Sequence, residues 1–157
     1  MNGRSISILL LTLLATLAFM PLAAAQGDFA VIVHPDNPIT NLSRGDLRKL
    51  LNGEKHSWPS GAPVKIIIRG PGCRERDALL KFLNLSESDY KQYWTAQVVR
   101  GEVDSEPFVA PSVGMVLEAV RVLPGAIGLV YVGDLKPRVK VVKVDGLLPG
   151  TLGYLLH

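Results

Sequence analysis

The sequence predicts an α/β domain with a largely parallel sheet flanked by helices. Short apolar runs rich in β-branched residues alternate with stretches that carry apolar residues at helical spacing. Turn residues separate most of these runs, and the chain has no internal repeat, low-complexity tract or obvious linker. Alternation of strands and helices along a chain is typical of sheets whose strands mostly run in the same direction.

The first 25 residues have the pattern of a secretory signal peptide, and we predict that they are removed. A short positive segment precedes the apolar run 6–20, and Pro21 leads to three small residues that end at Ala25. The alternative is an uncleaved membrane anchor, since the apolar run approaches the length that spans a bilayer. Cleavage after Ala25 leaves residues 26–157 as a single secreted domain.

Size and charge restrict what the mature chain can be. Without the signal peptide, 132 of the 157 residues remain, enough for a hydrophobic core without disulfides. The single cysteine, Cys73, excludes an internal disulfide framework. The formal charge of +3, reduced to +2 when Arg4 is removed, is too weak to indicate nucleic acid. No second apolar segment reaches bilayer-spanning length, so we expect no membrane span in the mature chain.

The first predicted strand, Phe29–Val33, is a β-branched apolar run that ends at a proline-rich turn. The helix after it starts at Ser43, which can cap it, and Asp46 places negative charge at the positive helix end. Its apolar face consists of leucines at helical spacing: Leu47, Leu50 and Leu51. Gly53 is a natural stop for this helix, and the second strand is expected at residues 64–68.

Two more helices follow the second strand. The first has an apolar face made of Leu79, Phe82 and Leu83, and the second begins at Ser86 with the same capping pattern. Tyr90, Tyr93 and Trp94 lie along one side of this third helix. Aromatic residues at helical spacing are more often core than a ligand platform, so we interpret them, and Trp58, as packing residues.

The last part of the chain predicts three strands and one helix. A short strand is expected at residues 108–110, and Ser112 can cap a fourth helix that ends at Pro124. Residues 127–132 and 139–144 are the final two strands. Valine and lysine alternate in the last run, which is typical of an edge strand.

The turn after the second strand is the stretch that indicates chemistry: Arg69-Gly70-Pro71-Gly72-Cys73-Arg74-Glu75-Arg76. Ligands of open α/β sheets bind at the carboxyl ends of strands, and the free N–H groups of a helix start suit an anion. Arg69, Arg74 and Arg76 add charge that matches a tetrahedral oxyanion. The alternative is an ordinary strand-to-helix turn with solvated arginines, because no nucleotide-binding fingerprint is present.

Other chemistry has little support in the sequence. Cys73 at a helix start could be a reactive thiolate, but no base is placed near it, and a small buried or bystander cysteine is the simpler interpretation. The three histidines lack metal-ligand spacing. There is no nucleophile elbow, pair of catalytic carboxylates or phosphate-cradling lysine motif. We therefore expect neither an enzyme nor a cofactor.

Four stretches resemble the PBP-like domain of phosphate ABC-importer substrate-binding proteins. Residues 42–58 (LSRGDLRKLLNGEKHSW) look like the family's helix followed by x-G-x-x-x-x-W, and residues 64–82 look like its strand and R-x-x-G-S-G-T-R-x-x-F turn. Tyr93-Trp94 is similar to the aromatic pair after that turn's helix. Residues 123–132 (LPGAIGLVYV) are similar to P-G-A-I-G-Y-V. The resemblance covers nearly the whole mature chain.

The resemblance implies a single lobe of a type II periplasmic-binding-protein fold, whereas the family closes two lobes on one oxyanion. By this likeness the ligand-binding residues are Arg69, Gly70, Gly72, Cys73, Arg74 and Arg76. Pro71 and Cys73 stand where the family has serine and threonine, so two good donors are weakened or lost. Half a site with fewer donors leaves a bound anion in contact with water, where ion pairing contributes little to the binding free energy.

Two functions follow from the resemblance. The leading hypothesis is a periplasmic, non-enzymatic protein of the phosphate-binding type that binds phosphate or a similar oxyanion weakly, in a site that a homodimer partner could complete. The alternative is an accessory or regulatory module that uses the lobe to contact an envelope protein and holds no ligand tightly.

Overall fold

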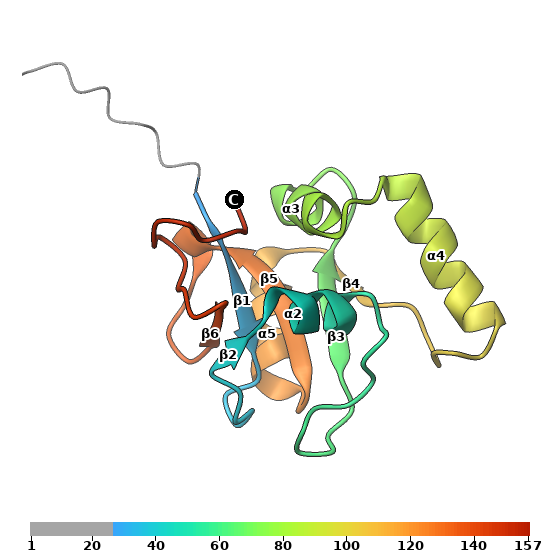
Figure 1. The fold of residues 1–157 in the computed structure, drawn as a ribbon, viewed down its shortest axis with the longest axis horizontal. Helices are drawn as coiled ribbons and strands as arrows, with labels where there is room; N and C mark the ends of the chain where they lie inside the picture. Colours follow the sequence, from blue (N-terminus) through green and yellow to red (C-terminus); the bar gives the residue numbers. More distant parts are fainter. Residues whose placement is uncertain (1–26) are drawn as a thin grey trace, which may run out of the picture.

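A six-stranded sheet with the order β2-β6-β1-β5-β3-β4 forms the centre of the computed structural model, which describes residues 27–157 (Figure 1). The strands are β1 (Phe29–Val33), β2 (Asn41–Leu42), β3 (Lys65–Arg69), β4 (Phe108–Ala110), β5 (Ala126–Tyr131) and β6 (Lys140–Val144). The predicted signal peptide lies outside the described residues.

The strands run mostly in one direction. β3 is parallel to β4 and β5, and β2 is parallel to β6, whereas β1 is antiparallel to both of its neighbours, β5 and β6. Five strands therefore share a direction and β1 alone opposes them. This arrangement confirms the predicted α/β class with a mostly parallel sheet flanked by helices.

Residues 27–157 form four α-helices: α2 (Arg44–Leu51), α3 (Arg74–Leu83), α4 (Glu87–Val99) and α5 (Val113–Val122). α2 and α3 pack on one face of the sheet and α5 packs on the other. Serine side chains cap three of the four helices as predicted, because Ser43, Ser86 and Ser112 each accept a hydrogen bond from a backbone N–H in the first turn. In Figure 1, α4 stands at the end of the molecule, beyond the β4 edge.

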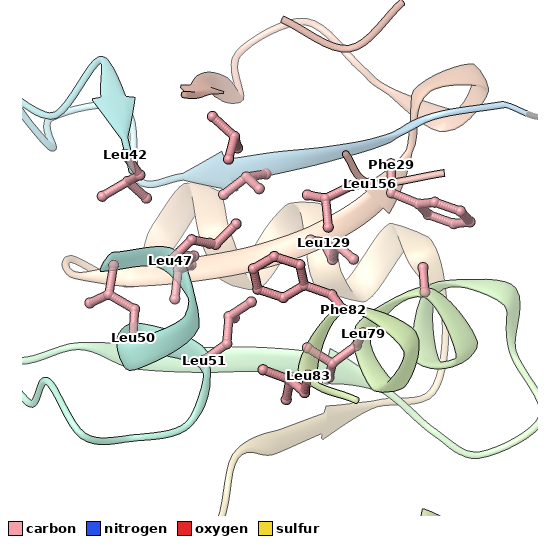
Figure 2. Close-up of a cluster of buried hydrophobic side chains, with 14 of the residues drawn as sticks. Phe29, Leu42, Leu47, Leu50, Leu51, Leu79, Phe82, Leu83, Leu129 and Leu156 are labelled. Carbon is pink, nitrogen blue, oxygen red and sulfur yellow. The ribbon is translucent and has the colours of Figure 1, made fainter. Parts of the chain in front are cut away.

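Successive residues of β1 divide between two cores, as the two-residue period of a strand requires. Val31 and Val33 pack with the buried side chains of α2 and α3, whereas Ala30 and Ile32 pack with those of α5. Figure 2 shows the first of these cores, where leucines of α2 lie next to Phe82 and the leucines of α3 on the same face of the sheet. Both faces of the central strand are therefore buried.

The aromatic residues that we interpreted as packing residues are in the first core. Tyr90 and Trp94 are buried in it, and Tyr93 packs against it. Trp58 is also buried, and its indole N–H donates a hydrogen bond of 2.9 Å to the Gly125 carbonyl oxygen.

The prediction that the last strand lies at an edge is wrong. β6 lies between β1 and the two-residue strand β2, which the sequence did not predict. Val142 and Val144 are buried in the core while Lys143 is exposed, so the alternation reflects a strand with one buried face rather than a free edge.

Ser86→Ala is expected to lower the free energy of unfolding by about 1 kcal/mol, because the Asp89 N–H loses its acceptor. The measurement is urea denaturation of both proteins. Ser88→Ala is the matched control, since Ser88 lies on the same helix and its hydroxyl accepts only from the Gln92 side chain. An equal loss in the two variants would contradict the capping role.

Candidate functional site

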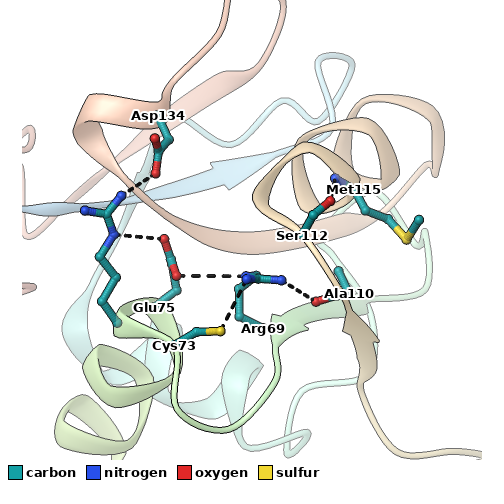
Figure 3. Close-up of polar contacts among 8 residues, drawn as sticks. Arg69, Cys73, Glu75, Ala110, Ser112, Met115 and Asp134 are labelled. Carbon is teal, nitrogen blue, oxygen red and sulfur yellow. Dashed lines mark hydrogen bonds and ion pairs between the residues drawn. The ribbon is translucent and has the colours of Figure 1, made fainter.

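The turn between β3 and α3 lies where two parallel strands end side by side. Arg69 is paired with Ala110 at the carboxyl ends of β3 and β4, so the start of α3 and the start of α5 lie at the same edge of the sheet (Figure 3). Gly72 has φ of +78°, a left-handed conformation that glycine adopts without strain, and this turns the chain from β3 into α3. The local geometry matches the predicted strand-to-helix turn.

Among the four described α-helices, α3 alone has no side-chain cap at its start. Cys73 occupies the N-cap position and its side chain accepts no hydrogen bond from the helix. Within residues 27–157, no hydrogen bond uses the backbone N–H of Gly72, Cys73 or Arg74 as its donor. Three backbone donors and the positive end of the α3 dipole therefore meet at this turn.

The Arg69 side chain connects this turn to β4 through hydrogen bonds. Its Nη1 donates to the Ala110 carbonyl oxygen at 2.9 Å, and its Nη2 donates to Cys73 Sγ at 3.2 Å. The Arg69 side chain is only 14% exposed, and its Nε lies 4.0 Å from Glu75 Oε2 (Figure 3). The arginine that we predicted to face an anion thus also has a structural role.

Arg74 is held between two carboxylates and an aromatic ring. Its Nη2 lies 2.5 Å from Asp134 Oδ2, its Nε lies 3.4 Å from Glu75 Oε1, and its guanidinium lies 3.8 Å from the centre of the Tyr131 ring. Desolvation opposes the charged form, but the hydrogen bonds to Asp134 and Glu75 prevail and raise the pKa of Arg74.

The side chain of Arg76 pairs with α4 and not with the other side chains of the turn. Its guanidinium donates two hydrogen bonds to the Glu87 carboxylate, at 2.9 and 2.7 Å, and lies 4.0 Å from the Tyr90 ring centre. Since each helical residue turns by about 100°, Arg74 and Arg76 project from opposite sides of α3. The prediction that Arg76 adds charge to the turn is corrected: it joins α3 to α4.

Glu75 and Asp134 are site residues that we did not predict. Glu75 could have been suspected from its place between two arginines in Arg74-Glu75-Arg76, whereas nothing in the sequence connects Asp134 to a turn sixty residues earlier. Together they balance the two arginines of the turn, so the positive charge predicted there is largely neutralised.

Two large pockets lie in the described part of the chain away from the turn, and residues 69–76 line neither of them. One, of about 540 Å³, lies between Trp94, Lys65 and the loop that ends at Phe108. The other, of about 740 Å³, lies between Tyr131 and the C-terminal segment. Among residues 27–157, no three His, Cys, Asp or Glu side chains are grouped as a metal site requires, and no helix is long and apolar enough to span a bilayer.

Residues 16–152 match the sequence profile of a PBP superfamily domain. This chain belongs to the PBP superfamily. That membership agrees with the resemblance to phosphate ABC-importer substrate-binding proteins, and solved structures of such proteins share its fold. No curated protein matches the sequence.

Three solved structures illustrate the likeness of this PBP superfamily domain to larger proteins. A putative phosphate ABC transporter substrate-binding protein from Clostridium perfringens, with bound phosphate, is 22% identical over 77% of this chain and 46% of that chain, with a TM-score of 0.62. An ABC-type phosphate transport receptor from Vibrio cholerae is 20% identical over 78% and 48%, with a TM-score of 0.63. PstS from Borrelia burgdorferi is 23% identical over 78% and 49%, with a TM-score of 0.60.

The PBP superfamily domain described here spans about half the length of these solved structures. Two of the four stretches that carry the resemblance contact each other in the fold, because Trp58 donates its hydrogen bond to the carbonyl of Gly125 in the P-G-A-I-G motif. These two motif residues therefore have a structural role, in joining the 53–64 loop to the start of β5.

Proposed function

We propose that this chain is a secreted, periplasmic and non-enzymatic binding protein of the phosphate-importer type, and that its β3–α3 turn binds phosphate or a similar tetrahedral oxyanion weakly. The observation that carries the proposal is the uncapped start of α3, which brings unused backbone donors together with Arg69 and Arg74. The phosphate-bound protein from Clostridium perfringens, which shares the fold, favours phosphate as the ligand to test.

The backbone would supply most of the contacts to the anion. The N–H groups of Gly72, Cys73 and Arg74 suit the oxygens of a tetrahedral ion, while Pro71 supplies none because it lacks the N–H. Arg74 is exposed at the surface, so a bound anion stays in contact with water and each charge pair with it contributes little to the binding free energy. Weak binding is the physical consequence.

Millimolar phosphate is expected to raise the melting temperature of the mature chain, and Arg74→Gln is expected to remove at least half of that shift. Arg121→Gln is the matched control, because Arg121 is an exposed arginine paired with Glu118 on α5. Titration calorimetry with phosphate, sulfate and arsenate gives the direct measurement. No heat from any of the three at millimolar concentration would remove small-oxyanion binding.

A second function, an accessory module that contacts an envelope protein, is favoured by the outer edge of the sheet. Phe108 and Val109 of β4 are about half exposed, and β4 has no neighbouring strand on that side among the described elements. Exposed apolar residues on an unpaired strand suit a protein contact. A co-purifying envelope protein together with no effect of oxyanions on stability would support this function over the first.

A further inference from the structure

The carboxylate of Glu75 has no role in the oxyanion binding proposed above, yet it lies at the centre of the turn. Its side chain is only 4% exposed, although it is charged and belongs to the first turn of a surface helix. Oε2 lies 4.0 Å from Arg69 Nε and Oε1 lies 3.4 Å from Arg74 Nε. Figure 3 shows Glu75 facing Arg69 across the turn.

A buried carboxylate in this place competes directly with an external anion. Guanidinium groups attract carboxylates and tetrahedral oxyanions alike. Glu75 accepts a hydrogen bond from Arg74 Nε and lies at ion-pair distance from Arg69 Nε, so it already offsets positive charge that would attract phosphate. Asp134 engages the other side of Arg74. With two cations and two anions in contact, the side chains of the turn offer an incoming anion no net charge, and only the backbone donors remain unopposed.

We propose that Glu75 is an internal counter-anion, meaning a carboxylate of the protein that occupies Arg69 and Arg74 and thereby keeps the affinity of the turn for external oxyanions low. This inference rests on the proposed function for its effect on affinity, whereas the pairing of Glu75 with the arginines does not. It explains why a turn with two arginines and an uncapped helix start presents so little positive charge.

Glu75→Gln tests the proposal, because the amide keeps the size of the side chain and removes its charge. The freed positive charge stands within several ångströms of the helix start, so phosphate is expected to bind at least about tenfold more tightly. Asp77→Asn is the matched control. Asp77 is an exposed acid in the same first turn, without a salt bridge to either arginine, and its removal is expected to change affinity less than threefold.

Titration calorimetry with inorganic phosphate at low ionic strength measures both variants against the wild type. An equal gain in the two variants would show a general charge effect and overturn the proposal. Weaker binding by Glu75→Gln would also overturn it, because Glu75 would then support the bound anion. If Glu75→Gln does not fold, Glu75→Asp replaces it, since the shorter carboxylate is withdrawn from the arginines and an intermediate gain is expected.

The thiol of Cys73 provides a second measurement that needs no phosphate. It is the only cysteine of the chain, and Arg69 Nη2 donates to its sulfur at 3.2 Å. With Glu75 neutralised, the charge of Arg69 acts on the thiolate without compensation, so iodoacetamide at neutral pH is expected to modify Glu75→Gln several-fold faster than the wild type or Asp77→Asn.

The two measurements separate the two proposals. An unchanged alkylation rate overturns the counter-anion role, whatever the binding result. Faster alkylation without phosphate binding by either protein overturns the proposed function, and with it the control of affinity, but supports the pairing of Glu75 with the arginines.

Discussion

Gly125→Ala is expected to lower the free energy of unfolding by more than about 3 kcal/mol, through backbone strain and a steric clash together. Gly125 has φ of +82°, which L side chains rarely adopt, and a methyl group there would lie 2.0 Å from the Pro63 carbonyl oxygen. Its own carbonyl accepts hydrogen bonds from the Trp58 indole and from the Lys65 N–H. Relief of the clash would separate the start of β5 from its partners.

Gly61→Ala isolates the contribution of the backbone. Gly61 has φ of +85° but no atom lies within 4 Å of the added methyl group, so only the conformational cost of about 1 kcal/mol is expected. Urea denaturation of both variants gives the comparison. If Gly125→Ala costs no more than Gly61→Ala, the expected clash between a methyl group at residue 125 and the Pro63 carbonyl does not occur.

The helices could be predicted because their signals are local. Each serine cap contacts a backbone group only three residues away, so Ser43, Ser86 and Ser112 fix helix starts without reference to the rest of the chain. The features of the sheet that the sequence did not predict depend on residues that are distant along the chain. β2 has two residues and exists because β6, a hundred residues later, lies beside it, and the direction of β1 is likewise set by β5 and β6.

The same distinction explains the site. Glycine, a strand end and a helix start are adjacent in sequence, so the turn was predictable, and the family resemblance named its residues. The partners of the side chains were not predictable from the sequence. Arg76 pairs with Glu87, and Arg74 pairs with Asp134. Both pairs depend on the orientation of α3 relative to α4 and to the end of β5. Positive residues counted in a motif thus overstate the charge that the folded turn presents.

The pairing of Arg76 with Glu87 predicts an unequal response to removal of either partner. Arg76 is 5% exposed, whereas the Glu87 side chain is 42% exposed. Glu87→Gln leaves a buried guanidinium without its counter-charge and is expected to lower the free energy of unfolding by about 2 kcal/mol. Arg76→Met leaves a carboxylate that water can reach, so less than about 1 kcal/mol is expected.

The pH dependence of stability gives an independent check of this pair. The hydrogen bonds from Arg76 hold the pKa of Glu87 below its ordinary value of 4.5, so the contribution of Glu87 is present above that value and is lost as the pH falls. In Arg76→Met the pKa of Glu87 returns towards its ordinary value, and the protein should lose less stability than the wild type between about pH 5 and 3. Parallel pH profiles from urea denaturation of the two proteins would show that the pair contributes nothing to holding α4 against α3.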